Sequence, residues 1–203
     1  MEKFSENEVR AALEPYHSKI RGAVVAGFAE WLSLGECRAD KGFAPVLYSR
    51  TISNYVFDAI VRNAMDAFST DPSVRVIDQV QTAKFCFGGT AVARFKKGDD
   101  DNLGQNIQTQ AVLEFVNAQQ SFPGMPPAAA KIEFIWTPDI LGTSVESILV
   151  IARDGDHILW SYEIEEEVSA SEVIAFPAPN GPDFDPPLVT PKAKPSEQDA
   201  KGN

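Results

Sequence analysis

A short run of basic and acidic residues near the middle of the chain has the side-chain types best suited to chemistry. Arg94, Lys96 and Lys97 are followed by the three carboxylates Asp99–Asp101. One interpretation is a strand end whose charges neutralise one another. The other is an anion or partner contact, because charged residues next to a loop are well placed for binding. In that interpretation Arg94 and Lys96 share a strand face and act with three amide side chains of the following loop, Gln105, Asn106 and Gln108.

Carboxylates are concentrated in the second half of the chain. Residues 1–101 contain 14 acidic and 13 basic residues, whereas residues 102–203 contain 15 and 5, which gives the whole chain a net charge of -11. This sign disfavours direct nucleic-acid binding, which depends on clustered Lys and Arg. It favours docking of a protein partner, basic or DNA-associated, on an acidic surface. Glu163 and Glu165, at the end of the last predicted strand, are the expected acidic contacts.

The sequence lacks the motifs of the common enzyme classes. It has no P-loop, no dinucleotide-binding glycine pattern, no nucleophile elbow and no HExxH pair. His17 and His157 are the two side chains that titrate near neutral pH without perturbation, and neither has a recognisable partner along the sequence. We therefore expect a non-enzymatic protein without a cofactor.

Metal-ligand spacings are also missing. Cys37 and Cys86 stand alone, which disfavours a zinc site and predicts free thiols. The segment Asp99–Gly104 has carboxylates at alternate positions, as in a calcium loop, but Leu103 replaces a ligand and Gln110 stands where a glutamate is needed. A solvated turn is the favoured interpretation of that segment.

Helices should form the N-terminal third. Ser5 and Glu8 have capping-box spacing before a short helix over residues 8–13, which Pro15 interrupts. Residues 15–34 form an amphipathic helix that Gly35 closes. Residues 49–69, capped by Ser49 or Thr51, form a second long helix. The two predicted apolar stripes are Ile20, Val24, Val25, Phe28, Trp31 and Leu32, and Ile52, Val56, Ala59, Ile60 and Phe68.

From Val74 onward the apolar residues recur with period two, which is typical of strands. Residues 82–97 are predicted to form a hairpin around a two-residue Gly88-Gly89 turn. That turn places Phe85, Phe87, Thr90 and Val92 on one face and Cys86, Ala91, Ala93 and Phe95 on the other. Residues 131–136 form a further strand with Ile132, Phe134 and Trp136 on one face, while residues 107–116 fit strand or helix equally well.

Asp154-Gly155 is a strong turn signal and predicts a last hairpin of residues 148–153 and 156–164. The expected pairing of Arg153 with Asp156 puts six apolar residues on one face: Leu149, Ile151, Ile158, Trp160, Tyr162 and Ile164. The predicted fold class is α+β, with N-terminal helices packed on a largely antiparallel β-sheet.

The organisation expected is one domain over residues 1–168, followed by an acidic, proline-rich, disordered tail over residues 169–203. No apolar stretch is long enough to cross a bilayer. The first residues lack the apolar core of a signal peptide. Both observations predict a cytoplasmic location.

The strings Val92–Gly98 and Leu103–Ala111 resemble a block found in uncharacterised bacterial proteins encoded near small regulators or toxin–antitoxin-type genes. The resemblance covers residues 10–166 and implies a regulatory accessory protein. It implies no activity and no functional residues. With the charge pattern, it leads to the expectation of a partner-docking protein.

The alternative is a small-molecule-binding domain or cryptic enzyme. Its apolar pocket would lie under the sheet and be lined by Phe85, Phe134, Trp136 and Trp160.

Overall fold

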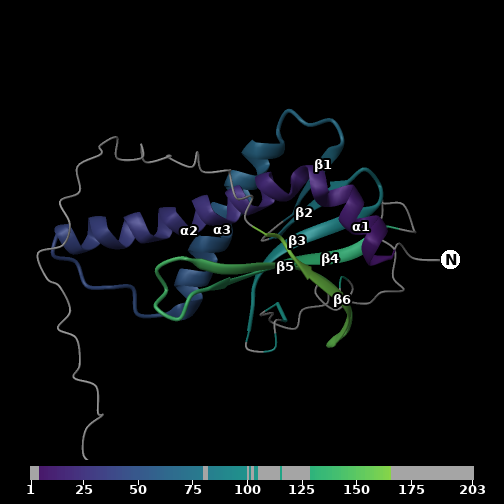
Figure 1. Cartoon of the computed structure of the whole chain (residues 1–203). Coiled ribbons are helices and arrows are strands. Elements are labelled where there is room, and N and C mark those ends of the chain that lie inside the picture. The colour runs from purple at the N-terminus through teal and green to yellow at the C-terminus, as the bar shows by residue number, and fades with distance from the viewer. Residues whose placement is uncertain are drawn as a thin grey trace, which may run out of the picture. The chain divides into compact units, whose positions relative to one another are not determined.

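The helices of this chain precede its strands (Figure 1). The computed structural model describes residues 5–79, 82–99, 101, 103–104, 115 and 129–165. Its helical part consists of α1 (Glu6–Leu13), the 3-10 turn η1 (Glu14–Tyr16), α2 (His17–Asp40) and α3 (Ser49–Phe68). The strands are β1 (Val74–Gln79), β2 (Thr82–Phe87), β3 (Ala91–Lys97), β4 (Ala130–Pro138), β5 (Val145–Asp154) and β6 (His157–Glu163).

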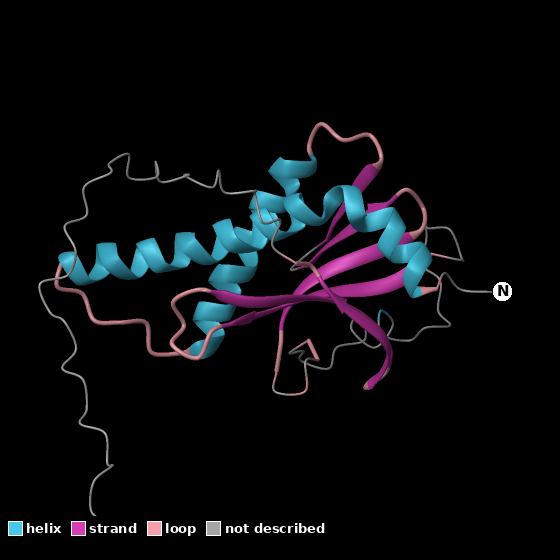
Figure 2. Ribbon diagram, in the orientation of Figure 1, coloured by secondary structure: helices cyan, strands magenta, loops and turns pink. Residues whose placement is uncertain are grey.

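The six strands form one mixed sheet in the order β1-β2-β3-β4-β5-β6 (Figure 2). All neighbouring pairs are antiparallel except β3 and β4, which run parallel. The predicted α+β class with a largely antiparallel sheet is therefore confirmed, but the parallel pair was not anticipated. A parallel pair needs a long crossover connection, which here spans residues 98–129.

One face of the sheet packs against the helices and forms the main core. Phe28 of α2 contacts Trp136 with ring centroids 5.8 Å apart, and Phe68 of α3 contacts Phe85 at 6.0 Å. The two helices approach each other closely at Gly27, where a Cβ would lie 2.6 Å from atoms of Ile60. Glycine is the residue that permits this contact.

The other face of the sheet also carries buried side chains. Cys86 and Val92 form a separate apolar cluster with Phe115, which lies in the crossover connection. Because Cys86 and Val92 alternate with the core residues along β2 and β3, Phe115 covers the face away from the helices. This hairpin is therefore covered on both faces.

The first two helices begin within two residues of their predicted starts, at Glu6 and His17, but α2 is longer than the sequence indicated. The Ser5 backbone amide and hydroxyl both donate to Glu8 Oε2, at 2.8 and 2.7 Å, so the capping box is present. The prediction that Gly35 closes α2 is wrong: the helix continues to Asp40, and Gly42, with φ 72°, follows its end. Unlike Gly35, Gly42 adopts the left-handed conformation that usually terminates a helix at glycine.

The predicted second long helix is confirmed as α3, although its expected cap is not. Tyr48 stands at the N-cap position, and no side-chain hydrogen bond caps the helix there. In the predicted stripes, Val25 is exposed and Trp31, Leu32 and Ile52 are partly buried. The remaining stripe residues are buried as expected.

Both hairpins form, but both predicted registers are wrong, the first by one residue and the last by two at Arg153. Phe87 pairs with Ala91, so the first turn contains three residues, Gly88 to Thr90. Phe85 and Phe87 therefore share the core face with Ala91, Ala93 and Phe95, while Cys86 and Val92 lie opposite. Turn length sets hairpin register, and a one-residue change moves every side chain of one strand to the other face.

In the last hairpin, Asp154 pairs with His157 around a Gly155-Asp156 turn. Tyr162 lies opposite Val150, and Trp160 lies opposite Ala152, so Leu149 and Ile151 do not share the face of Trp160 and Tyr162. A register shift between Ala152 and Arg153 leaves Leu159 without a direct partner on β5. The expected pairing of Arg153 with Asp156 is replaced by Arg153 with Ile158.

Other expectations have different outcomes. The proposed tail over residues 169–203 lies outside the described residues, as does the segment 107–116 except for Phe115. Cys37 is exposed, Cys86 is buried, and both are free thiols, as predicted. Among the described residues, no helix combines the length and the apolar character needed to cross a membrane.

Candidate functional site

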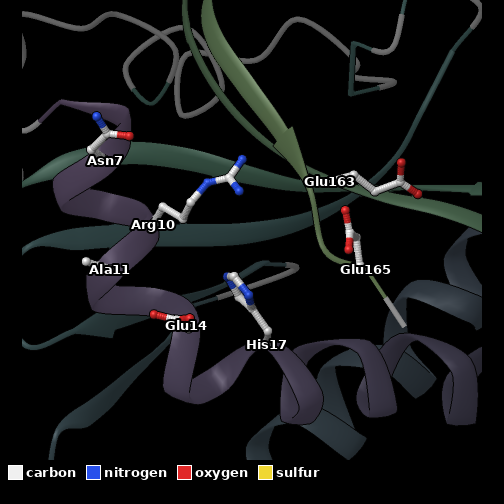
Figure 3. A pocket seen from close by; sticks show the side chains of 7 residues that line it. All are labelled: Asn7, Arg10, Ala11, Glu14, His17, Glu163 and Glu165. Atoms are coloured by element: carbon white, nitrogen blue, oxygen red, sulfur yellow. The ribbon is translucent and has the colours of Figure 1, made fainter. Parts of the chain in front are cut away.

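A cleft of about 460 Å³ lies between the N-terminal helical segment and the end of β6 (Figure 3). It is lined by Asn7, Arg10, Ala11, Glu14, His17, Glu163 and Glu165. Most of these side chains are polar or charged, and all but His17 are exposed. The cleft therefore fits a polar group rather than an apolar ligand.

The helical wall of the cleft, formed by α1 and η1, is one face of this helical segment. Asn7, Arg10, Ala11 and Glu14 are three or four residues apart, so they form one stripe on the solvent side of the helical segment. Val9 and Leu13 on the opposite side of α1 are fully buried and hold the helix against the core. Glu8 closes the start of the helix, and the Ser5 backbone amide that it binds lowers the pKa of its carboxyl.

Tyr162 connects the helical wall to the strand wall. His17 Nε2 and the Tyr162 hydroxyl share a hydrogen bond of 3.2 Å, and the Arg10 guanidinium lies 4.2 Å from the centre of the Tyr162 ring. Arg10 is also 3.5 Å from Glu6. Burial raises the pKa of the Tyr162 phenol well above its usual range, so the hydroxyl stays protonated. Tyr162 thus orients both His17 and Arg10 along the cleft.

The charge of the cleft is predominantly negative. Glu14 comes from η1, Glu163 from the end of β6, and Glu165 from two residues beyond it. Figure 3 shows these carboxylates on opposite sides of the cleft, with His17 and Arg10 between them. Arg10 is the cation among the lining residues, and it is already engaged with Tyr162 and Glu6. The arrangement can accept hydrogen bonds and charge from a Lys or Arg side chain.

The described residues give no indication of a metal centre in this cleft. No group of three or more His, Cys, Asp and Glu side chains in the described ranges is arranged to hold a metal ion. His157, the other histidine, is exposed at the start of β6 and pairs with Asp154 across the hairpin end.

The predicted site residues divide between two places. Glu163 and Glu165 line the cleft. Arg94 and Lys96 lie elsewhere, on the sheet face away from the helices, and Lys97 follows at the end of β3. The three amide residues Gln105, Asn106 and Gln108 lie outside the described residues.

Arg94 belongs to a buried ionic cluster on three neighbouring strands. It donates to Glu133 Oε1 through Nε at 2.8 Å and through Nη2, and its guanidinium lies 4.2 Å from the ring centre of Phe115. Arg153 Nε donates to Glu133 Oε2 at 2.7 Å, and Arg153 Nη1 donates to the Gly155 carbonyl at 3.1 Å. Arg94, Glu133 and Arg153 are 4%, 1% and 7% exposed, so this cluster has a structural role.

Lys96 lies two residues further along β3, on the same strand face as Arg94. Burial, reinforced by the nearby guanidiniums of Arg94 and Arg153, lowers the pKa of its amine from 10.5 to about 8. After β3, the Asp99 side chain holds the backbone of its own loop. Its Oδ1 accepts hydrogen bonds from the backbone amides of Asp101, at 3.1 Å, and Leu103, at 2.7 Å.

The sequence did not predict the helical wall of the cleft, nor the roles of Glu133 and Arg153 in the ionic cluster. The spacing of Asn7, Arg10 and Glu14 marks one exposed stripe and could have indicated the helical wall. Glu133 stands between Ile132 and Phe134 in an apolar strand, which is a recognisable sign of a buried carboxylate. No pattern along the chain connected it to Arg94 or Arg153.

Comparisons with known proteins add no assignment, because no family model, no curated protein and no solved structure matches this chain.

Proposed function

We propose that this protein is a non-enzymatic binding protein that docks a basic segment of a protein partner in the cleft between α1 and the end of β6. The observation that carries the proposal is the convergence of Glu14, Glu163 and Glu165 from separate elements on one hollow. A regulatory accessory role, as the sequence resemblance implies, is consistent with such docking.

The chemistry of the cleft favours a guanidinium or ammonium group. Carboxylates on opposite walls can accept several N–H donors at once, and charge-assisted hydrogen bonds are the stronger kind. Tyr162 and Arg10 are fixed by mutual contact and by the His17 hydrogen bond, so part of the wall is ordered before a partner arrives. The chain's net charge of -11 would attract a basic partner from a distance.

The alternative of an apolar pocket under the sheet receives less support. Phe85, Phe134 and Trp136 are buried in the core that α2 and α3 cover, and Phe85 and Phe134 both contact Phe95, with ring centroids 5.4 and 5.1 Å away. Trp160 is partly buried and stacks on Tyr162 at 6.4 Å. These aromatic rings fill space against one another in the described part of the chain.

A direct test compares peptide binding to two variants with equal charge changes. The cleft variant carries Glu14→Gln, Glu163→Gln and Glu165→Gln. The control variant carries Glu36→Gln, Asp66→Asn and Glu146→Gln, three exposed positions on α2, α3 and β5 outside the cleft lining. Fluorescence anisotropy with a labelled arginine-rich peptide, and with an acidic peptide of equal length, measures affinity.

We expect the wild-type protein to prefer the basic peptide and the cleft variant to bind it about tenfold more weakly, since exposed ion pairs contribute about 0.2–1 kcal/mol each. The control variant should change affinity less than about threefold. Equal weakening in both variants would show that only overall charge matters, and the cleft assignment would then be wrong.

A further inference from the structure

The strand that forms one wall of the cleft is also an edge of the sheet. Within the described part of the chain, β6 pairs with β5 alone and is the last strand of the sheet. In an edge strand every second residue directs its N–H and C=O groups away from the sheet. These groups form a template for another extended chain.

The residue types on this edge differ from those on the opposite edge of the sheet. Natural edge strands are usually protected by charged residues, prolines or bulges. The other edge, β1, contains Arg75 and Asp78 in its six residues. In β6 the five residues from Ile158 to Tyr162 contain neither a charge nor a proline.

The regular part of this edge adjoins the acidic cleft. The register shift near Ile158 and Leu159 disturbs the hairpin end of β6, but from Trp160 to Glu163 the pairing with β5 is regular. The Ile164 amide continues the ladder by donating to the Ile148 carbonyl at 2.8 Å. Glu163 and Glu165, at and beyond this end, line the cleft. The free backbone edge and the carboxylates are therefore adjacent along one short segment.

We infer that the partner's basic segment binds as an added β-strand along Trp160–Glu163 and places a Lys or Arg side chain in the cleft. This inference rests on the proposed function and specifies the partner's conformation. Main-chain hydrogen bonds would supply affinity, and the cleft would select a basic side chain, as in other complexes formed by strand addition. The partner segment would be extended and would lack proline at the positions that bond to β6.

A second copy of this chain fits the edge less well. An antiparallel β6–β6 pairing would bring the hairpin end of one copy toward the cleft of the other, and that end carries Asp154 and Asp156. Carboxylates would then face carboxylates, which disfavours the pairing. A foreign basic segment has the complementary charge.

The test uses a short peptide of alternating threonine and valine with one central arginine and with both ends blocked. Its binding to the protein is measured by fluorescence anisotropy. Two further peptides carry N-methyl groups on backbone amides, one at the odd positions and the other at the even positions. An added strand bonds to β6 through only one of these two sets. We expect one methylated peptide to lose about tenfold or more in affinity and the other to lose less than about threefold.

The outcomes separate the two proposals. Equal binding of both methylated peptides, with weaker binding to the cleft variant, would overturn strand addition and retain the acidic docking site. Discrimination between the methylated peptides without any effect of the cleft variant would overturn the acidic site. Sedimentation of the protein alone completes the test: a dimer disrupted by Ser161→Lys on the exposed edge would show that β6 is occupied by a second copy and would refute the inference.

Discussion

The buried carboxylate of Glu133 provides the sharpest test of how this sheet is held together. It is 1% exposed and accepts hydrogen bonds from two guanidiniums, those of Arg94 and Arg153. Replacement by glutamine keeps the shape of the side chain and removes its charge. We therefore predict that Glu133→Gln destabilises the fold without changing its packing volume.

The expected magnitude follows from the individual contacts. Arg94 Nε binds Oε1 at 2.8 Å, and Arg153 Nη2 binds the same oxygen at 3.3 Å, so a glutamine carbonyl placed there can keep these bonds. The bond from Arg153 Nε to Oε2, at 2.7 Å, is then lost, because the amide nitrogen is itself a donor. One lost charge-assisted bond and two guanidiniums without a buried countercharge together predict a loss of about 3–5 kcal/mol.

Urea unfolding followed by tryptophan fluorescence measures this loss, because urea is uncharged and does not screen the ion pairs. Glu146→Gln on the neighbouring strand β5 is the matched control, since Glu146 is exposed. Its cost should be within about 0.5 kcal/mol of zero. A double-mutant cycle with Arg153→Met should give a coupling energy of about 2 kcal/mol or more. A loss below about 1 kcal/mol for Glu133→Gln would refute the reasoning, because a buried countercharge cannot be removed so cheaply.

Three further predictions concern single side chains. Gly27→Ala brings a Cβ within 2.6 Å of Ile60 and should cost about 1–3 kcal/mol in urea unfolding, whereas Gly22→Ala, with no atom within 4 Å, should stabilise α2 by about 0.5–1 kcal/mol. Gly155→Ala, at a φ of 61°, should lower the melting temperature through a cost of about 1 kcal/mol. The pKa of the Lys96 amine is about 8 in the folded state, below its ordinary value of 10.5. Between these pH values the unfolded state binds more protons, so the stability of the wild-type protein should rise with pH, by about 1–2 kcal/mol after screening. The variant Lys96→Met should abolish this rise.

The two long helices were predictable because their apolar residues repeat with helical spacing over several turns. The capping box at Ser5 and the stripe from Val56 to Phe68 both depend on residues close in sequence. The predicted end of α2 at Gly35 is wrong because a helix tolerates glycine at a modest cost. Local patterns identify a helix more reliably than they locate its last residue.

The strands show a different limit. Alternation identified the strands around Phe85 and Phe134, but hairpin register depends on whether a turn contains two or three residues, which the residues Gly88 to Thr90 leave ambiguous. The parallel pairing of β3 with β4 depends on a long connection whose course has no local signature. Glu163 and Glu165 were predicted as contacts, and the spacing of Asn7, Arg10 and Glu14 marks a stripe on the helical segment, but no pattern along the chain shows that these two elements meet.

The burial of Arg94 changes how the charge of the whole chain should be interpreted. Lys84, Arg94 and Arg153 are buried with Glu133, so three cations and one carboxylate are withdrawn from the surface. The rest of the chain therefore carries two more negative charges than the total of -11 implies. A basic partner that docks at the surface meets the exposed carboxylates directly, whereas Lys84, Arg94 and Arg153 are out of contact with it. The near-neutral balance of residues 1–101 thus overstates the number of cations that the N-terminal half exposes, because Lys84 and Arg94 are counted in that balance.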